Sequence, residues 1–136
     1  MKKHIVPMLV VLSFHIAMAC ETNTFNIYYL PIDADFYIPT TREYIKQHGI
    51  NFEMDSCELT SLFKTVTDQS GVEPQIEDYK VLRILIISKS DNSEIFITSD
   101  KQVISNDKKY NVDVKIVDNV LNEIVGFISS KKLGSP

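Results

Sequence analysis

Apolar side chains along this chain recur either in strand-like runs or at the 3.6-residue period of a helix. The strand-like runs concentrate in the middle of the sequence, and the helical period occurs on either side of it. Residues 81–88 carry the longest apolar run of the central region, which is typical of a buried strand. The same reasoning predicts shorter strands over residues 25–30, 50–54, 94–99, 102–105 and 110–112. Polar turns at 90–93, 100–101 and 106–109 separate the later strands and favour antiparallel hairpins.

The helical period occurs in three segments. Thr40 and Glu43 have capping-box spacing, and Gly49 suits a helix C-terminus, so a short helix is predicted between them. A second helix is expected to begin near Asp55 or Ser56, because the apolar residues that follow share one face: Leu59, Leu62, Phe63 and Val66.

The last helix has the clearest amphipathic pattern, and Asp113 is placed to cap it. Its apolar stripe consists of Ile116, Val117, Val120, Leu121, Ile124, Val125 and Ile128. This pattern predicts a helix that belongs to the core, and residues 129–136 are expected to fray.

Together these elements predict an α+β fold. We expect a mostly antiparallel central sheet of three to five short strands, packed by two short helices and the C-terminal helix. Apart from Arg83, residues 82–87 are apolar on both faces of their strand, so both faces need cover. Either the helices with the N-terminal strand and loop supply all of it, or another chain, such as a second copy in a homodimer, supplies part.

The first nineteen residues have the features of an export signal. Lys2 and Lys3 precede an apolar stretch over residues 5–19, and no acidic residue occurs before Glu21. That stretch is too short to span a bilayer of about 30 Å as a helix. Ala17-Met18-Ala19 supplies the small residues of a cleavage site, so we expect residues 1–19 to be removed and residues 20–136 to form a single domain.

Export bears on the two cysteines, which support two incompatible hypotheses. Cleavage after Ala19 leaves Cys20 at the mature N-terminus, and residues 16–20 resemble the lipobox of bacterial lipoproteins, which implies acylation of Cys20. Alternatively, Cys20 and Cys57 form a disulfide, as suits an oxidising compartment. An acylated Cys20 has no thiol with which to form a disulfide, so the two hypotheses exclude each other.

Charge and the remaining side chains exclude several function classes. Loss of Lys2 and Lys3 leaves 12 basic against 18 acidic residues, a net charge of −6, which disfavours nucleic acid as a partner and favours basic proteins. His48 is then the one histidine of the mature chain, which argues against a zinc site or a histidine-dependent nucleophile. Four scattered glycines build no phosphate loop, and we expect no catalytic residue, cofactor or metal.

The residues with recognition chemistry gather in one short segment. Four aromatic residues and two carboxylates lie within ten positions, and tyrosine is favoured at protein interfaces. The predicted partner-binding residues are these six and one on the second face of the strongest strand: Tyr28, Tyr29, Asp33, Asp35, Phe36, Tyr37 and Arg83.

These observations favour a small exported bacterial protein, periplasmic or secreted, that binds another protein of the cell envelope as an inhibitor or immunity protein does. This reasoning rests on size and compartment. The alternative is a lipid-anchored structural or assembly component, for which acylation of Cys20 would be the main evidence. A carboxylate-dependent hydrolase ranks last, since no carboxylate pair in the sequence marks it.

Overall fold

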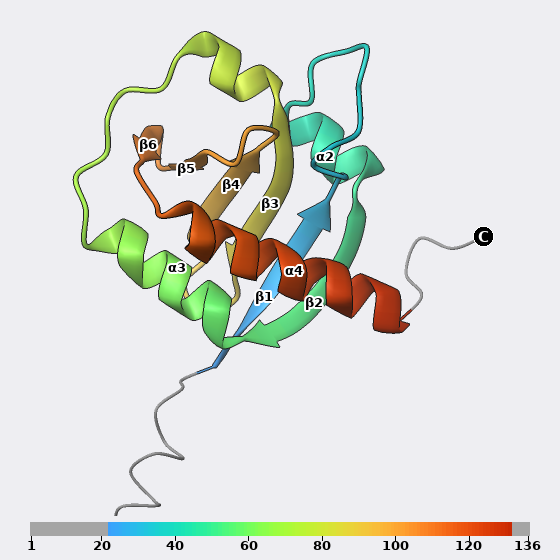
Figure 1. Cartoon of the computed structure of the whole chain (residues 1–136), viewed down its shortest axis with the longest axis vertical. Coiled ribbons are helices and arrows are strands. Elements are labelled where there is room, and N and C mark those ends of the chain that lie inside the picture. The colour runs from blue at the N-terminus through green and yellow to red at the C-terminus, as the bar shows by residue number, and fades with distance from the viewer. Residues whose placement is uncertain (1–21, 132–136) are drawn as a thin grey trace, which may run out of the picture.

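Six strands form one antiparallel sheet in the order β2-β1-β3-β4-β5-β6 (Figure 1). The computed structural model describes residues 22–131, so the export signal predicted at 1–19 and Cys20 lie outside the described residues. The elements in chain order are β1 (Asn23–Tyr29), α2 (Arg42–His48), β2 (Ile50–Ser56), α3 (Cys57–Thr67), the 3₁₀ helix η2 (Ile76–Lys80), β3 (Leu82–Ser88), β4 (Glu94–Thr98), β5 (Val103–Ser105), β6 (Lys108–Tyr110) and α4 (Val114–Lys131). The predicted α+β fold with an antiparallel sheet and a C-terminal helix is confirmed, but the prediction of three to five strands is wrong.

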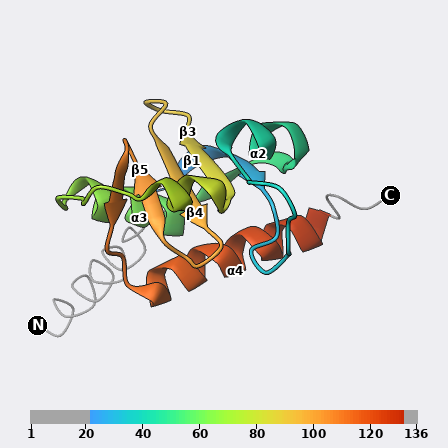
Figure 2. The same ribbon diagram turned by 90° about the horizontal axis from the view of Figure 1, so that it is seen from above.

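The sheet lies between two layers, with α4 on one side and α2 on the other (Figure 2). The larger apolar core lies between the sheet and the helices α3 and α4, and includes Phe25, Ile84 and Leu121. A smaller core on the opposite face includes Ile45 of α2 and Leu85 of β3. Elements of the described chain therefore cover both faces of β3, as its two-sided apolar run requires. No helix within residues 22–131 is long and apolar enough to cross a membrane.

The helix starts follow the chemistry of their cap residues, with small shifts from prediction. Thr41, not Thr40, caps α2, since its side chain accepts the Tyr44 N–H at 3.3 Å. Ser56 caps α3 by accepting the Leu59 N–H at 2.9 Å. Thr40 is buried instead, because its backbone joins the start of β3 through a bridge to Val81.

The last strand was expected over residues 110–112, but the turn before it is shorter than predicted and the strand begins earlier. The predicted turn over residues 106–109 is two residues long, because Asn106 (φ 50°) and Asp107 (φ 58°) both adopt the left-handed conformation. Such a two-residue turn matches the twist of the flanking strands. Lys108 therefore already pairs with Ser105, and the last strand is Lys108–Tyr110 rather than 110–112.

Candidate functional site

The loop between β1 and α2, residues 31–39, is fixed to the sheet at both ends. Before it, the Leu30 N–H donates to the Arg83 carbonyl at 2.8 Å. After it, the Thr40 N–H donates to the Lys80 carbonyl at 2.9 Å, and the Thr40 carbonyl accepts the Leu82 N–H at 3.1 Å. The loop therefore leaves and rejoins the sheet beside the first residues of β3. We call residues 31–39 the recognition loop.

Arg83 lies between the sheet and the recognition loop and contacts the loop from its inner side. Its side chain is only 7% exposed. One guanidinium nitrogen, Nη1, donates to Thr40 Oγ1 at 2.6 Å, and Nη2 donates to the Ala34 carbonyl at 3.3 Å. The guanidinium carbon also lies 4.6 Å from the centre of the Phe36 ring, within the range of a cation–π contact.

The Arg83 guanidinium is strongly desolvated. Its Nε atom is buried without a hydrogen-bond partner among the described residues. Burial lowers the pKa of Arg83, and the nearby Asp35 carboxylate opposes that shift. Arg83 was predicted to contact a partner. The structure places it under the loop, because α2 and the loop cover this face of β3.

Of the predicted aromatic cluster, the structure brings one ring fully into solvent. Tyr37 is completely exposed, and Ile38 beside it is 55% exposed. Phe36 packs on the smaller core and meets the Tyr44 ring edge-on at 6.0 Å. Tyr28 and Tyr29 are half-buried on opposite faces of β1, as successive strand residues must be.

Both carboxylates of the recognition loop are exposed. Asp33 raises the pKa of Tyr29, although burial of the phenol contributes more to that shift. Asp35 lies close enough to Arg83 to affect its pKa. Within residues 22–131, no group of three or more His, Cys, Asp or Glu residues could hold a metal ion. What the loop presents is therefore a tyrosine ring and an isoleucine beside two negative charges.

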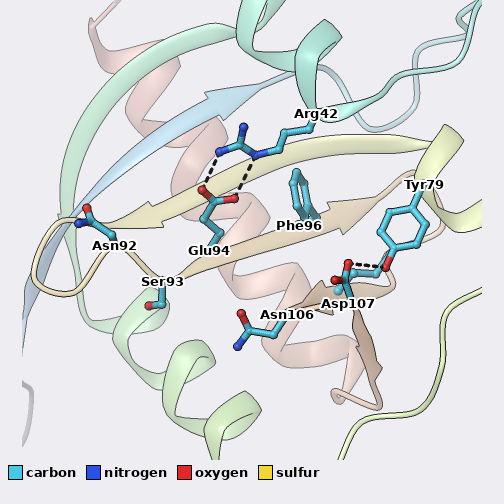
Figure 3. A pocket seen from close by; sticks show the side chains of 9 residues that line it. Arg42, Tyr79, Asn92, Ser93, Glu94, Phe96, Asn106 and Asp107 are labelled. Atoms are coloured by element: carbon cyan, nitrogen blue, oxygen red, sulfur yellow. Dashed lines mark hydrogen bonds and ion pairs between the residues drawn. The ribbon is translucent and has the colours of Figure 1, made fainter.

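A second feature, which the sequence analysis missed, is a hollow of about 330 Å³ on the same face of the sheet as α2 (Figure 3). Its lining includes Arg42, Tyr79, Glu94, Phe96, Asn106 and Asp107. These residues come from α2, η2, β4 and the turn before β6, so no sequence motif links them.

The charged groups of this hollow are bound to one another. Arg42 clamps Glu94 with two hydrogen bonds of 3.1 and 2.7 Å, and this pairing is the largest of the causes that raise the pKa of Arg42. The Tyr79 hydroxyl donates to Asp107 at 3.2 Å, and burial together with Asp107 raises the pKa of Tyr79. The carboxylates therefore tie α2 and η2 to the strands.

The remaining predicted residues have structural positions of their own. His48 is the last residue of α2, exposed, with its ring 4.4 Å from that of Tyr44. Cys57 is the first residue of α3, while Cys20 lies outside the described residues. The choice for Cys20 between acylation and pairing with Cys57 stays a prediction.

Comparisons with known proteins add no relative to this picture. No family model, no curated protein and no solved structure matches the chain. Inferences about function rest on the geometry of the recognition loop and of the sheet around it.

Proposed function

We propose that this chain is an exported bacterial protein that binds another protein of the cell envelope, as an inhibitor or immunity protein does. The observation that supports it is the recognition loop, where a fully exposed Tyr37 stands beside the exposed carboxylates of Asp33 and Asp35. Aromatic rings of this kind dominate binding energy when a partner buries them.

The bracing by Arg83 supports recognition because it holds the loop before a partner arrives. A loop that is already ordered loses less conformational entropy on binding, and the saving is about 0.5–1.5 kcal/mol for each side chain that would otherwise be immobilised. Pro31 and Pro39 further restrict the backbone at the two ends of the loop.

The charge of the loop favours a basic partner. Asp33 and Asp35 belong to the acidic excess of the chain, and exposed charges mainly accelerate encounter with an oppositely charged surface. Association should therefore slow as salt rises from 0.05 to 0.5 M, because the Debye length falls well below about 10 Å.

A photo-crosslinking residue in place of Tyr37 tests the proposal in cells of the source organism. We expect one discrete cross-linked protein, formed in lower yield when Asp33→Ala and Asp35→Ala are added. The matched control carries the same photo-reactive residue in place of Ile76, which is 74% exposed on η2. Equal cross-linking from both positions, or capture unaffected by the two substitutions, would contradict the proposal.

The chemistry of the mature N-terminus separates this function from the lipid-anchored alternative. We expect mass spectrometry of exported protein to show residues 1–19 removed. A disulfide between Cys20 and Cys57 fits a released binding protein, whereas acyl chains on Cys20 with no capture through Tyr37 fit an anchored envelope component. Material that still begins at Met1 would refute export by cleavage.

A further inference from the structure

The two edges of the sheet differ in how they are protected. At one edge, β6 has three residues, and Val72 exchanges two backbone hydrogen bonds with Lys109, of 2.9 and 2.7 Å. At the other edge, β2 has seven residues and pairs with β1 along its whole length without a register shift. No segment of residues 22–131 pairs with the outer side of β2.

Such an edge presents a continuous row of unpaired backbone N–H and C=O groups. Natural sheets usually shorten, bulge or cover their edge strands, because an open edge is a template for another strand. Here β6 is short and bridged, and β2 is long and regular. The open edge therefore has the backbone geometry that β-augmentation uses, in which a partner adds a strand to a sheet.

The two faces of β2 are chemically distinct. Phe52 and Met54 are buried against the larger core. Asn51, Glu53 and Asp55 point to the opposite face and are exposed. A strand added beside β2 would have one set of alternate side chains next to the apolar residues and the other set next to the two carboxylates. Glu53 already pairs with Lys89 at 2.8 Å, and Asp55 accepts the Thr24 hydroxyl at 2.5 Å, but both carboxylates stay exposed.

On the apolar side, α4 extends over the place where that strand would lie. The helix crosses the sheet and continues past β2 (Figure 1), and the Phe127 ring stacks on the Phe52 ring at 5.2 Å. From Phe127 to Lys131 the helix rises about 6 Å, at 1.5 Å per residue. That rise is larger than the spacing of about 4.8 Å between neighbouring strands.

We propose that β2 binds an extended segment of the partner as a seventh strand, with alternate apolar residues facing the last turn of α4 and alternate Lys or Arg residues facing Glu53 and Asp55. This inference rests on the proposed protein-binding function and names its mode of recognition. Opposite charges on directly paired residues stabilise a strand pair by about 0.2–1 kcal/mol each.

Charge also argues against a second copy as the occupant. A symmetric antiparallel pair of β2 strands that uses all seven residues would place Glu53 opposite the Glu53 of the other copy, since Glu53 is the middle residue of Ile50–Ser56. Like charges directly opposite destabilise a strand pair. The Lys89 side chain, 2.8 Å from Glu53 of its own chain, relieves only part of that repulsion, because the pair is half-exposed.

The test uses a capped nine-residue peptide of alternating valine and lysine, added to the full mature protein. Backbone amide exchange followed by NMR should slow in β2 on binding, and the affinity should fall about three- to tenfold for a Glu53→Gln/Asp55→Asn variant. A matched variant, Glu73→Gln/Glu77→Gln, removes two exposed carboxylates away from β2 and should bind as the parent does. Peptides of alternating valine and glutamate, or with a central proline, should not bind.

Specific outcomes would overturn the edge proposal. One is that the valine–lysine peptide leaves the amide exchange rates of β2 unchanged, or slows exchange in the recognition loop instead. Another is that sedimentation shows a dimer whose β2 amides are protected from exchange without any peptide. Tyr37→Ala should leave peptide binding intact, which keeps the two proposals apart. If cross-linking at position 37 captures a partner but the peptide does not slow amide exchange in β2, the edge proposal fails and the loop proposal stands. If the peptide protects β2 but cross-linking at position 37 captures nothing, only the loop proposal is overturned.

Discussion

Replacement of Arg83 by methionine is expected to loosen the recognition loop while changing global stability little. Methionine keeps most of the length of the side chain and its contact with apolar neighbours, but it removes the charge. The substitution abolishes the hydrogen bonds to Thr40 Oγ1 at 2.6 Å, to the Ala34 carbonyl at 3.3 Å and to the Leu82 carbonyl at 3.3 Å. It also abolishes the cation–π contact with Phe36 at 4.6 Å.

The magnitude follows from opposing terms of similar size. Three charge-assisted hydrogen bonds contribute about 1.5–3 kcal/mol each, and a desolvated cation–π contact contributes about 2 kcal/mol. Against this gain, burial of the guanidinium costs several kcal/mol, and an unpaired Nε costs about 1–3 kcal/mol more. Because the gains and the costs cover the same range, we expect the free energy of unfolding of Arg83→Met to stay close to that of the parent.

Two measurements separate the global effect from the local one. Urea unfolding should give nearly equal free energies for the parent and Arg83→Met. Amide exchange at Ala34 and Thr40 should accelerate by about tenfold or more, since about 1.4 kcal/mol of local stabilisation corresponds to a factor of ten. Arg83→Ala is the control that also removes packing, and it should lower both quantities. Unchanged exchange in the loop of Arg83→Met, with folding intact, would refute the bracing role.

Three further predictions concern the core, a close contact and the pH dependence. Leu121→Ala should lower the free energy of unfolding by about 2–5 kcal/mol in urea titrations, because this side chain is buried in the larger core. Asn122→Ala, on the exposed side of α4, should change it by less than about 0.5 kcal/mol, and equal effects of the two substitutions would contradict the packing of α4. Gly49→Ala should cost about 1–3 kcal/mol, because its β-carbon would lie 2.6 Å from a carbonyl oxygen of α2, and an unchanged melting temperature would contradict that contact. Burial raises the pKa of Tyr29 and Tyr79 above 10.0, so the unfolded chain loses these protons at lower pH than the folded one, and the free energy of unfolding should fall as pH rises past 10. Tyr79→Phe should reduce that fall, and an equal fall in the variant would contradict the raised pKa of Tyr79.

Local rules that act within a few residues were readable from the sequence. The apolar stripe of α4 contained all of its buried residues, among them Val117, Val120 and Ile124, but also Val125, which is exposed. Ser56 was one of two positions expected to start α3, and it supplies the cap. The cap of α2 was misplaced by one residue, because Thr40 and Thr41 can both cap a helix. The start of β6 was misplaced by two residues, because a polar turn without glycine does not show which of its residues form the turn.

Contacts that join distant segments were not readable in the same way. The hollow beside α2 takes Arg42 and Glu94 from elements 52 positions apart, and neither residue belongs to a motif. Arg83 was noticed, but as a surface residue. The signal that could have corrected this was its position inside a two-sided apolar run, where a buried arginine needs acceptors from another segment.

The patterns of β2 and β3 also contain information on where each strand lies in the sheet. Residues 82–87 are apolar on both faces apart from Arg83, and β3 is a central strand with cover on both sides. Residues 50–55 alternate strictly between apolar and polar, and β2 is an edge strand with one face exposed. A strand that needs cover on only one face is the one that the fold can leave at the margin, where its second hydrogen-bonding side is open. The alternation in β2 also places Glu53 and Asp55 on its exposed face, where they would select the charge of an incoming strand.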